Sequence, residues 1–130
     1  MDFKELTTYE AICKVDGVDP VQSLPFPKFT SEEEKAVNEV AKNFRIVRVL
    51  NGGWVPDWYN WDERKWMLWF DMSPEGTAGG SAAGFSLCAV ADGREHSRVG
   101  SRLVFKTREI AEHYAEHFLE VSRGWMVIES

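Results

Sequence analysis

The chain has little of what marks secreted or membrane proteins. Its two cysteines, Cys13 and Cys88, are too few for a disulfide framework, so we expect free thiols in a reducing compartment. No apolar run approaches the roughly 20 residues that span a bilayer. The charged start Met1–Glu5 contains no apolar signal-peptide core. These absences predict a cytoplasmic protein that makes no contact with a membrane.

The chain also lacks an excess of positive charge. Fifteen Lys and Arg stand against 21 Asp and Glu, and the net charge is −6. Proteins that bind nucleic acid by neutralising phosphates need a basic surface, so a nucleic-acid partner is not expected. The acidity is too mild to indicate a DNA mimic, although Glu32–Glu34 would lie on the competing surface of one. A length of 130 residues suits one domain with one core.

Tryptophan is the residue that the chain has in excess. Five of its six tryptophans fall within sixteen positions, with Tyr59 among them and Phe70 directly after. Trp is costly to leave in water and is the commonest anchor of binding interfaces. The segment is therefore either the centre of the core or a contact surface. Its tryptophans are Trp54, Trp58, Trp61, Trp66 and Trp69.

Helices are expected before the tryptophan-rich segment. Thr7–Glu10 has the form of a capping box, which predicts a short helix within a helical and loop segment over 1–30. Thr30–Glu34 is a stronger helix start, because a hydroxyl can cap the helix and three acids complement its dipole. A long helix is therefore expected over 31–51. Its apolar residues recur at helical spacing: Val37, Val40, Ala41, Phe44 and Val47.

An antiparallel sheet is expected over 64–106. Period-two patterning predicts strands at 65–72, 85–91 and 99–106. The expected core faces are Trp66, Leu68, Phe70 and Met72, then Phe85, Leu87 and Ala89, then Val99, Ser101, Leu103 and Phe105. The Gly/Ala/Ser-rich stretch 73–84 is interpreted as a hairpin connection. It lacks the Gly-Lys-Ser/Thr sequence and the following helix of a phosphate loop.

A second amphipathic helix is expected over 107–123. Thr107 can cap it, Gly124 can end it, and an apolar stripe runs along it from Ile110 to Val121. No repeat or linker divides the chain. The predicted fold is a single α+β domain over 1–130, with N-terminal helices, a three-stranded antiparallel meander and a C-terminal helix packed on the sheet.

Four blocks of sequence, with the start Thr8–Ala11, resemble a known group of proteins. The blocks are Asn51-x-Gly53-Trp54-x-Pro56-Asp57-Trp58, Trp69-Phe70-Asp71, Val99-Gly100-Ser101-Arg102-Leu103-x-Phe105-Lys106 and Ala111-Glu112-x-x-Ala115-x-x-Phe118. Over most of the chain they are similar to small uncharacterised proteins encoded in bacteriophages and prophages of gut bacteria. The resemblance implies an intracellular accessory protein that binds host or phage components. It implies no catalytic residue.

One motif indicates metal chemistry. His113-x-x-Glu116-His117 matches the pattern of inverted zinc peptidases, in which two His hold zinc and the Glu is the general base. A third ligand is needed, and Glu120 and Glu129 are the only later side-chain carboxylates. The surrounding glutamates also fit a solvated helix face. No cofactor is therefore expected, and a zinc-dependent hydrolase is kept as the alternative.

The tryptophan-rich segment leads to the main functional hypothesis. If the three strands are neighbours, Trp69 shares the outer face of the sheet with Arg102 and Lys106. Aromatic rings beside Arg and Lys can bind a protein partner or a second copy of the chain. The predicted contact surface is Trp54, Trp58, Trp61, Trp69, Arg102 and Lys106.

Two other interpretations of this segment are open. In the first, Trp66, Leu68 and Phe70 are core residues, Trp54 and Trp58 cover a sheet edge, and helix 31–50 covers the outer face. In the second, exposed Trp rings stack on sugars beside Asp57, Asn60 and Asp62. Protein binding ranks above sugar binding because no secretion signal is visible.

Overall fold

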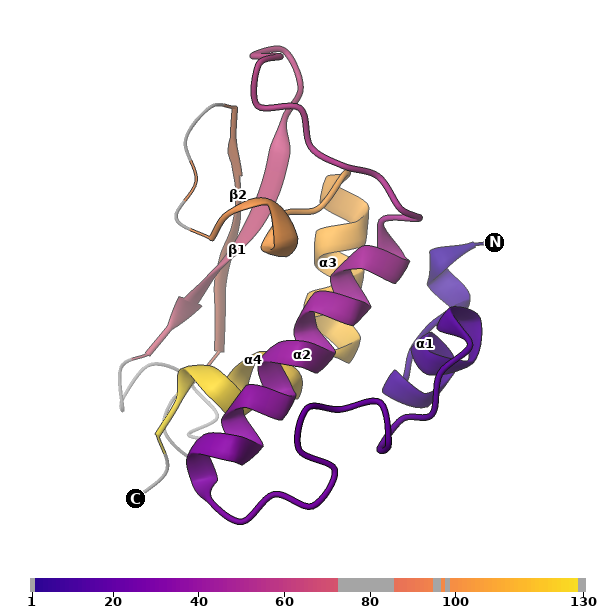
Figure 1. Cartoon of the computed structure of the whole chain (residues 1–130). Coiled ribbons are helices and arrows are strands. Elements are labelled where there is room, and N and C mark those ends of the chain that lie inside the picture. Colours follow the sequence, from indigo (N-terminus) through magenta and orange to yellow (C-terminus); the bar gives the residue numbers. More distant parts are fainter. Residues whose placement is uncertain (1, 73–85, 95–96, 98, 129–130) are drawn as a thin grey trace.

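The helices of the protein lie on one side of a small antiparallel sheet (Figure 1). The computed structural model describes residues 2–72, 86–94, 97 and 99–128. Short 3-10 helices occur at Phe3–Glu5 and Ser101–Leu103. The other elements are α1 (Tyr9–Asp16), α2 (Glu32–Leu50), β1 (Lys65–Asp71), β2 (Ser86–Gly93), α3 (Arg108–His117) and α4 (Leu119–Met126). The expected α+β class is confirmed.

The long helix begins at the predicted capping signal. Ser31 Oγ accepts a hydrogen bond from the backbone N–H of Glu34 (3.1 Å), and the Glu34 carboxylate accepts one from the N–H of Thr30 (2.8 Å). These reciprocal bonds satisfy N–H groups that have no partner inside the helix. α2 then runs to Leu50, where Gly52 and Gly53 turn the chain with positive φ angles of 64° and 81°.

The core forms where α2 and α3 meet one face of the sheet. α3 packs over both strands, while α2 packs against α1 and α4. Buried apolar residues of all these layers form one cluster: Leu6, Ile12, Ile46, Val47, Leu50, Leu68, Phe105, Ile110, Ala111, Tyr114 and Phe118. Because α2 and α3 share this face, the interpretation in which helix 31–50 covers Trp69 is wrong. None of the helices in the described ranges has the length and apolar character to cross a bilayer.

The sheet contains an irregularity that the sequence does not reveal. β1 and β2 are antiparallel, with Lys65 opposite Gly93 and Asp71 opposite Ser86, and the register shifts between Trp69 and Phe70. A bulge of this kind adds a residue to one strand and changes which side chains share a face. Leu87 packs on the core, as predicted, together with Val90, three positions away. Phe85 and the side chain of Ala89, the other members of the predicted core face, lie outside the described part of the chain.

The expected third strand over 99–106 is not observed. Gly100 has a positive φ of 75°, and the N–H of Leu103 bonds back to the Gly100 carbonyl, so the chain coils into a 3-10 turn. Phe105 then pairs with Trp66 in a single antiparallel bridge. In the part of the chain that the structure describes, the sheet is two-stranded.

The single helix predicted over 107–123 is two helices. The break falls at Phe118 (φ −126°, ψ 13°), whose ring is buried in the core. The change of direction brings Ser122 and Trp125 of α4 against Asn43 of α2, to which both donate hydrogen bonds. The helix does not stop at Gly124, as the sequence predicts, but continues to Met126.

Candidate functional site

The segment from Trp54 to Glu63, which we call the aromatic loop, rises beyond one end of the sheet (Figure 1). Its base is fixed by Asn51, the buried residue that follows α2. The Asn51 amide donates to the Val104 carbonyl (3.0 Å) and accepts from the backbone N–H of Lys106 (3.0 Å). A buried side chain that makes both bonds fixes the start of the loop to the chain that enters α3.

The backbone of the aromatic loop is held by its own polar side chains. Glu63 accepts from the N–H of Asp57 (2.7 Å), and Asp57 accepts from the N–H of Tyr59 (3.0 Å). Asn60 accepts from the N–H of Asp62 (3.0 Å) in the same manner. Such side-chain to backbone bonds define tight turns. The loop therefore has a specified conformation without being part of a helix or strand.

A buried lysine joins the aromatic loop to the sheet. The Lys65 side chain is 0% exposed, and its ammonium donates to the carbonyls of Asn60 (3.0 Å), Glu63 (2.9 Å) and Arg94 (2.9 Å). These bonds use all three of its N–H donors. The Glu63 carboxylate lies 3.5 Å away and the centre of the Trp58 ring 5.2 Å away. The arrangement ties the second half of the loop to β1 and to Arg94, directly after β2.

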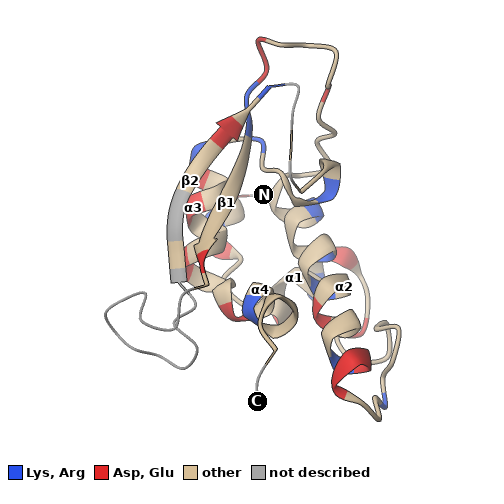
Figure 2. Cartoon of the chain, turned by 90° about the vertical axis from the view of Figure 1, so that its left-hand side faces the viewer, with Lys and Arg blue, Asp and Glu red and all other residues tan. Residues whose placement is uncertain are grey.

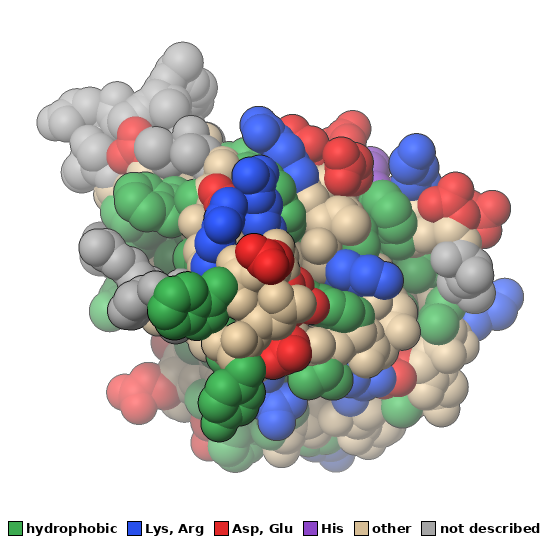
Figure 3. All heavy atoms as spheres, turned by 90° about the horizontal axis from the view of Figure 1, so that it is seen from above, with side chains coloured by type: hydrophobic (Ala, Val, Ile, Leu, Met, Phe, Trp, Pro, Cys, Tyr) green, Lys and Arg blue, Asp and Glu red, His purple; other side chains and the backbone are tan. Residues whose placement is uncertain are grey.

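The held loop presents apolar side chains to solvent. Tyr59 is 98% exposed, Val55 77% and Trp61 64%. Figure 3, which looks down onto this end of the molecule, shows hydrophobic side chains protruding beside charged ones. Figure 2 marks Lys and Arg positions, in blue, along the backbone at the end of the sheet beneath the loop. Large apolar groups held rigidly in water are the usual anchors of a binding interface.

The four tryptophans predicted to bind a partner lie in different environments. Trp61 belongs to the exposed part of the loop. Trp54 and Trp58 are half-buried, and the Trp58 indole N–H donates to Ser101 Oγ (2.7 Å). Trp69 is 49% exposed on the face of β1 opposite Leu68, away from the loop.

The two predicted cations do not join Trp69. Arg102 lies in the 3-10 turn, and its guanidinium is 5.9 Å from the centre of the Phe44 ring on α2. Lys106 is exposed just before α3. The expected shared face requires residues 99–106 to be the third strand of the sheet, and the 3-10 turn that begins at Gly100 takes its place. The predicted residues therefore do not form one surface. Only the three tryptophans of the aromatic loop, Trp54, Trp58 and Trp61, lie in one segment.

The predicted contact surface omits Val55, Tyr59 and Lys65. The turn-forming neighbours Asp57 and Asn60 are a signal that Tyr59 is exposed, because rings inside tight turns point away from the chain. No local signal marks Lys65. Its burial depends on the Arg94 carbonyl, which is 29 positions away.

The His113-x-x-Glu116-His117 motif lies on α3 beside the N-terminal segment. His113 is buried, and its Nε2 is 2.7 Å from the Leu6 carbonyl oxygen. A carbonyl only accepts, so this nitrogen carries hydrogen and has no lone pair for a metal. His117 Nε2 is 3.7 Å from the Glu116 carboxylate. Among the described residues, His, Cys, Asp and Glu form no group of three that could hold a metal ion. The zinc alternative stays a prediction.

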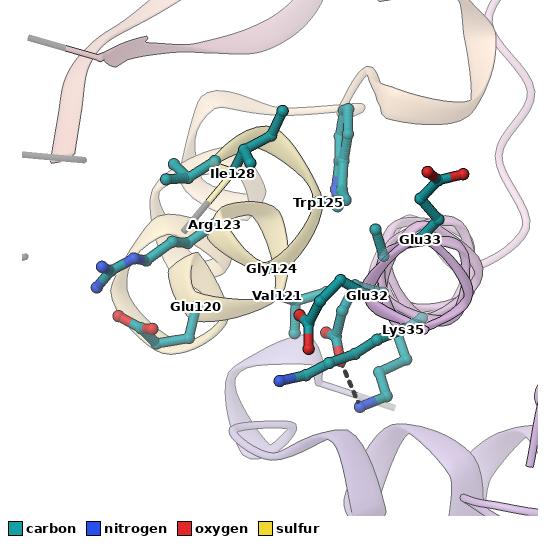
Figure 4. A pocket seen from close by; sticks show the side chains of 13 residues that line it. Glu32, Glu33, Lys35, Glu120, Val121, Arg123, Gly124, Trp125 and Ile128 are labelled. Carbon is teal, nitrogen blue, oxygen red and sulfur yellow. Dashed lines mark hydrogen bonds and ion pairs between the residues drawn. The ribbon is translucent and has the colours of Figure 1, made fainter. Parts of the chain in front are cut away.

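A groove of about 840 Å³ runs between the start of α2 and α4 (Figure 4). Acidic and basic side chains both line it, so it selects no single charge. The residues at its edges include Glu32, Glu33, Lys35, Glu120 and Arg123. The acidic helix start that a DNA mimic would use therefore has a lysine within it. The expected hairpin connection at 73–84 lies outside the described residues.

The chain matches no protein-family model, no curated protein and no solved structure. The site is therefore interpreted from its own geometry.

Proposed function

We propose that the protein is a non-catalytic cytoplasmic binding module that acts through the aromatic loop. The observation that supports it is Tyr59 and Trp61, two largely exposed rings on a loop that a buried ammonium and several side-chain bonds hold in place. A rigid loop loses little conformational entropy when it binds, so its apolar anchors contribute more of their burial to affinity. The resemblance to phage and prophage proteins favours a host or phage component as the partner.

The partner is proposed to be a protein rather than a sugar. Sugar recognition needs polar groups that are available to bind hydroxyls beside the rings. Asp57, Asn60 and Glu63 each use a side-chain oxygen to hold the loop backbone. The exposed set of Tyr59 and Trp61 is completed by aliphatic Val55, which suits an apolar protein surface.

Site-specific photo-crosslinking tests the proposal. The photoreactive residue p-benzoylphenylalanine replaces Tyr59, and in a matched control it replaces Phe29, another exposed aromatic residue. In cells that naturally express the chain, the Tyr59 site is expected to give a discrete protein adduct that Trp61→Ala removes. The Phe29 site is expected to give none. Equal labelling from both sites, or no adduct from Tyr59, contradicts the proposal.

Sugar binding is the second candidate, and the same rings report on it. Oligosaccharides titrated against the Trp61 fluorescence would give a saturable change if the rings stack on a sugar. Such a change, lost in Trp61→Ala and unaccompanied by a protein adduct at Tyr59, would replace the protein-binding proposal with the sugar-binding one.

A further inference from the structure

A cavity of about 70 Å³ lies between the core face of β1, α2 and α4, apart from the aromatic loop. Protein interiors rarely contain voids larger than one water molecule, whose share of liquid volume is about 30 Å³. Buried residues form its closed end, and partly exposed residues form its rim. The lining is Asn43, Val47, Leu68, Phe70, Val99, Leu103, Phe105, Tyr114, Ser122, Trp125 and Met126. Most of these side chains are apolar, as in small-molecule sites.

The closed end carries a polar cluster from three helices. Asn43 Oδ1 lies 3.0 Å from the Tyr114 hydroxyl, 3.1 Å from the Ser122 hydroxyl and 2.9 Å from Trp125 Nε1. The indole N–H only donates, which identifies this atom of Asn43 as the oxygen. The two hydroxyls lie 2.5 Å apart, so one of them donates to the other. The two hydroxyl hydrogens and the indole N–H are therefore all used in hydrogen bonds within the cluster.

Hydrogen-bonding capacity nevertheless remains at this end. Asn43 is buried, and the three hydrogen bonds of the cluster all go to its oxygen, so they use neither of the two N–H donors on its amide nitrogen. The hydroxyl oxygens of Tyr114 and Ser122 retain lone pairs. Burial raises the pKa of the Tyr114 phenol, so the cluster stays uncharged. A group that both accepts and donates a hydrogen bond, and carries no charge, complements this end.

We propose that the cavity binds a short aliphatic alcohol, with its hydroxyl against Asn43, Tyr114 and Ser122. A 150 Å³ cavity in another protein holds the six carbons of benzene, so this one of about 70 Å³ has room for roughly three non-hydrogen atoms. The alkyl chain lies against the apolar walls, and a longer chain leaves through the rim at Val99. This site is independent of the aromatic loop and of the function proposed for it.

The experiment uses 1-propanol and the full ¹⁵N-labelled chain. The indole N–H of Trp125 reports on the cluster, because it bonds to Asn43. Millimolar 1-propanol is expected to shift its NMR signal saturably. 1-Chloropropane, which lacks the hydroxyl, is expected to bind about tenfold more weakly. Equal binding of the two overturns the assigned role of the polar end.

Three variants separate the cavity from general solvent effects. Val99→Phe at the rim and Val47→Ile in the wall reduce the space and are expected to abolish saturation. Val99→Phe leaves the buried core unchanged, which protects the test if Val47→Ile fails to fold. Val37→Phe, on an exposed position of α2, is the matched control and keeps the response. A linear shift that is the same in all chains, or water as the only occupant detected, overturns the proposal.

Discussion

Lys65 is buried because three backbone carbonyls replace the water around its ammonium. An ammonium without such partners would strongly destabilise the fold, since burying an unpaired charge is costly. The same bonds satisfy carbonyls at two points of the aromatic loop and at the end of β2. One residue therefore stabilises the fold and orders the loop that carries Tyr59 and Trp61.

Replacing this side chain should be costly. Lys65→Met removes the three donors from the partly buried carbonyls that they satisfy, so we expect the free energy of unfolding to fall by about 3 kcal/mol. Urea unfolding measures the change. Lys28→Met, at an exposed position, is the control and should change the stability by less than about 0.5 kcal/mol. Equal stability of the two variants would show that the ammonium bonds contribute nothing.

Asp16 ties α1 to α2 through charge. Its carboxylate accepts two hydrogen bonds from Arg48 (2.9 and 2.8 Å) and lies 3.3 Å from the Arg45 guanidinium. The hydrogen bond from Arg48 lowers the pKa of this carboxyl below its ordinary 3.8. A pKa that is lower in the folded state means that the ionised form stabilises the fold.

The pH dependence follows from this sign. The contribution of Asp16 is complete above the unfolded pKa near 3.8 and is lost as pH falls through the lower folded pKa. The melting temperatures of wild type and Asp16→Asn should therefore differ at pH 6 and converge in strong acid. Asp62→Asn, at an exposed carboxylate, is the control, and its melting temperature should stay close to that of wild type at both pH values. A difference for Asp16→Asn that stays constant with pH would contradict the account.

At the scale of elements, the contact of α4 with α2 depends on Gly124. A Cβ at this position would lie 2.7 Å from Glu39 Cγ, closer than atoms approach without a shift. Gly inside a helix ordinarily destabilises it relative to Ala. The sequence predicts that the helix stops at Gly124 because glycine commonly ends helices. It does not show that α2 packs against this position and leaves no room for a Cβ.

This contact predicts an inverted glycine-to-alanine effect. Gly124→Ala should lower the free energy of unfolding by about 1 kcal/mol, because overpacking exceeds the gain in helix propensity. Glu39→Ala in the same chain removes the Cγ and should recover most of the loss. The control is Glu39→Ala alone, and chemical denaturation compares all three. A stabilised Gly124→Ala variant would mean that the helices are not in close contact.

The elements that sequence predicts well are those set by neighbouring residues. α2 follows from the hydroxyl at Ser31, the acids after it and the apolar spacing, all within the helix itself. The strand β1 follows from alternation in the same way. The helix break at Phe118 and the bulge in the sheet depend on which side chains enter a shared core. No pattern confined to the segment itself contains that information.

The candidate site could be predicted only in part for the same reason. The density of tryptophan marks the loop as unusual, whether its rings are exposed or buried. Which of these rings is exposed depends on tertiary contacts. Trp58 is held by Ser101, which lies 43 positions away, while Trp61 is exposed to solvent. The prediction for Arg102 depends on a strand over 99–106, and the chain forms a 3-10 helix at Ser101–Leu103 instead.

For the whole molecule, the central claim is that the aromatic loop presents Trp61 to water while its neighbour Trp58 is held against the fold. Acrylamide quenching of tryptophan emission, compared between wild type, Trp61→Phe and Trp58→Phe, tests it most directly. The account predicts that Trp61→Phe removes much of the red-shifted, readily quenched emission and that Trp58→Phe leaves it. If the quenched fraction is unchanged in Trp61→Phe, the ring is covered in solution and the loop is not the binding surface.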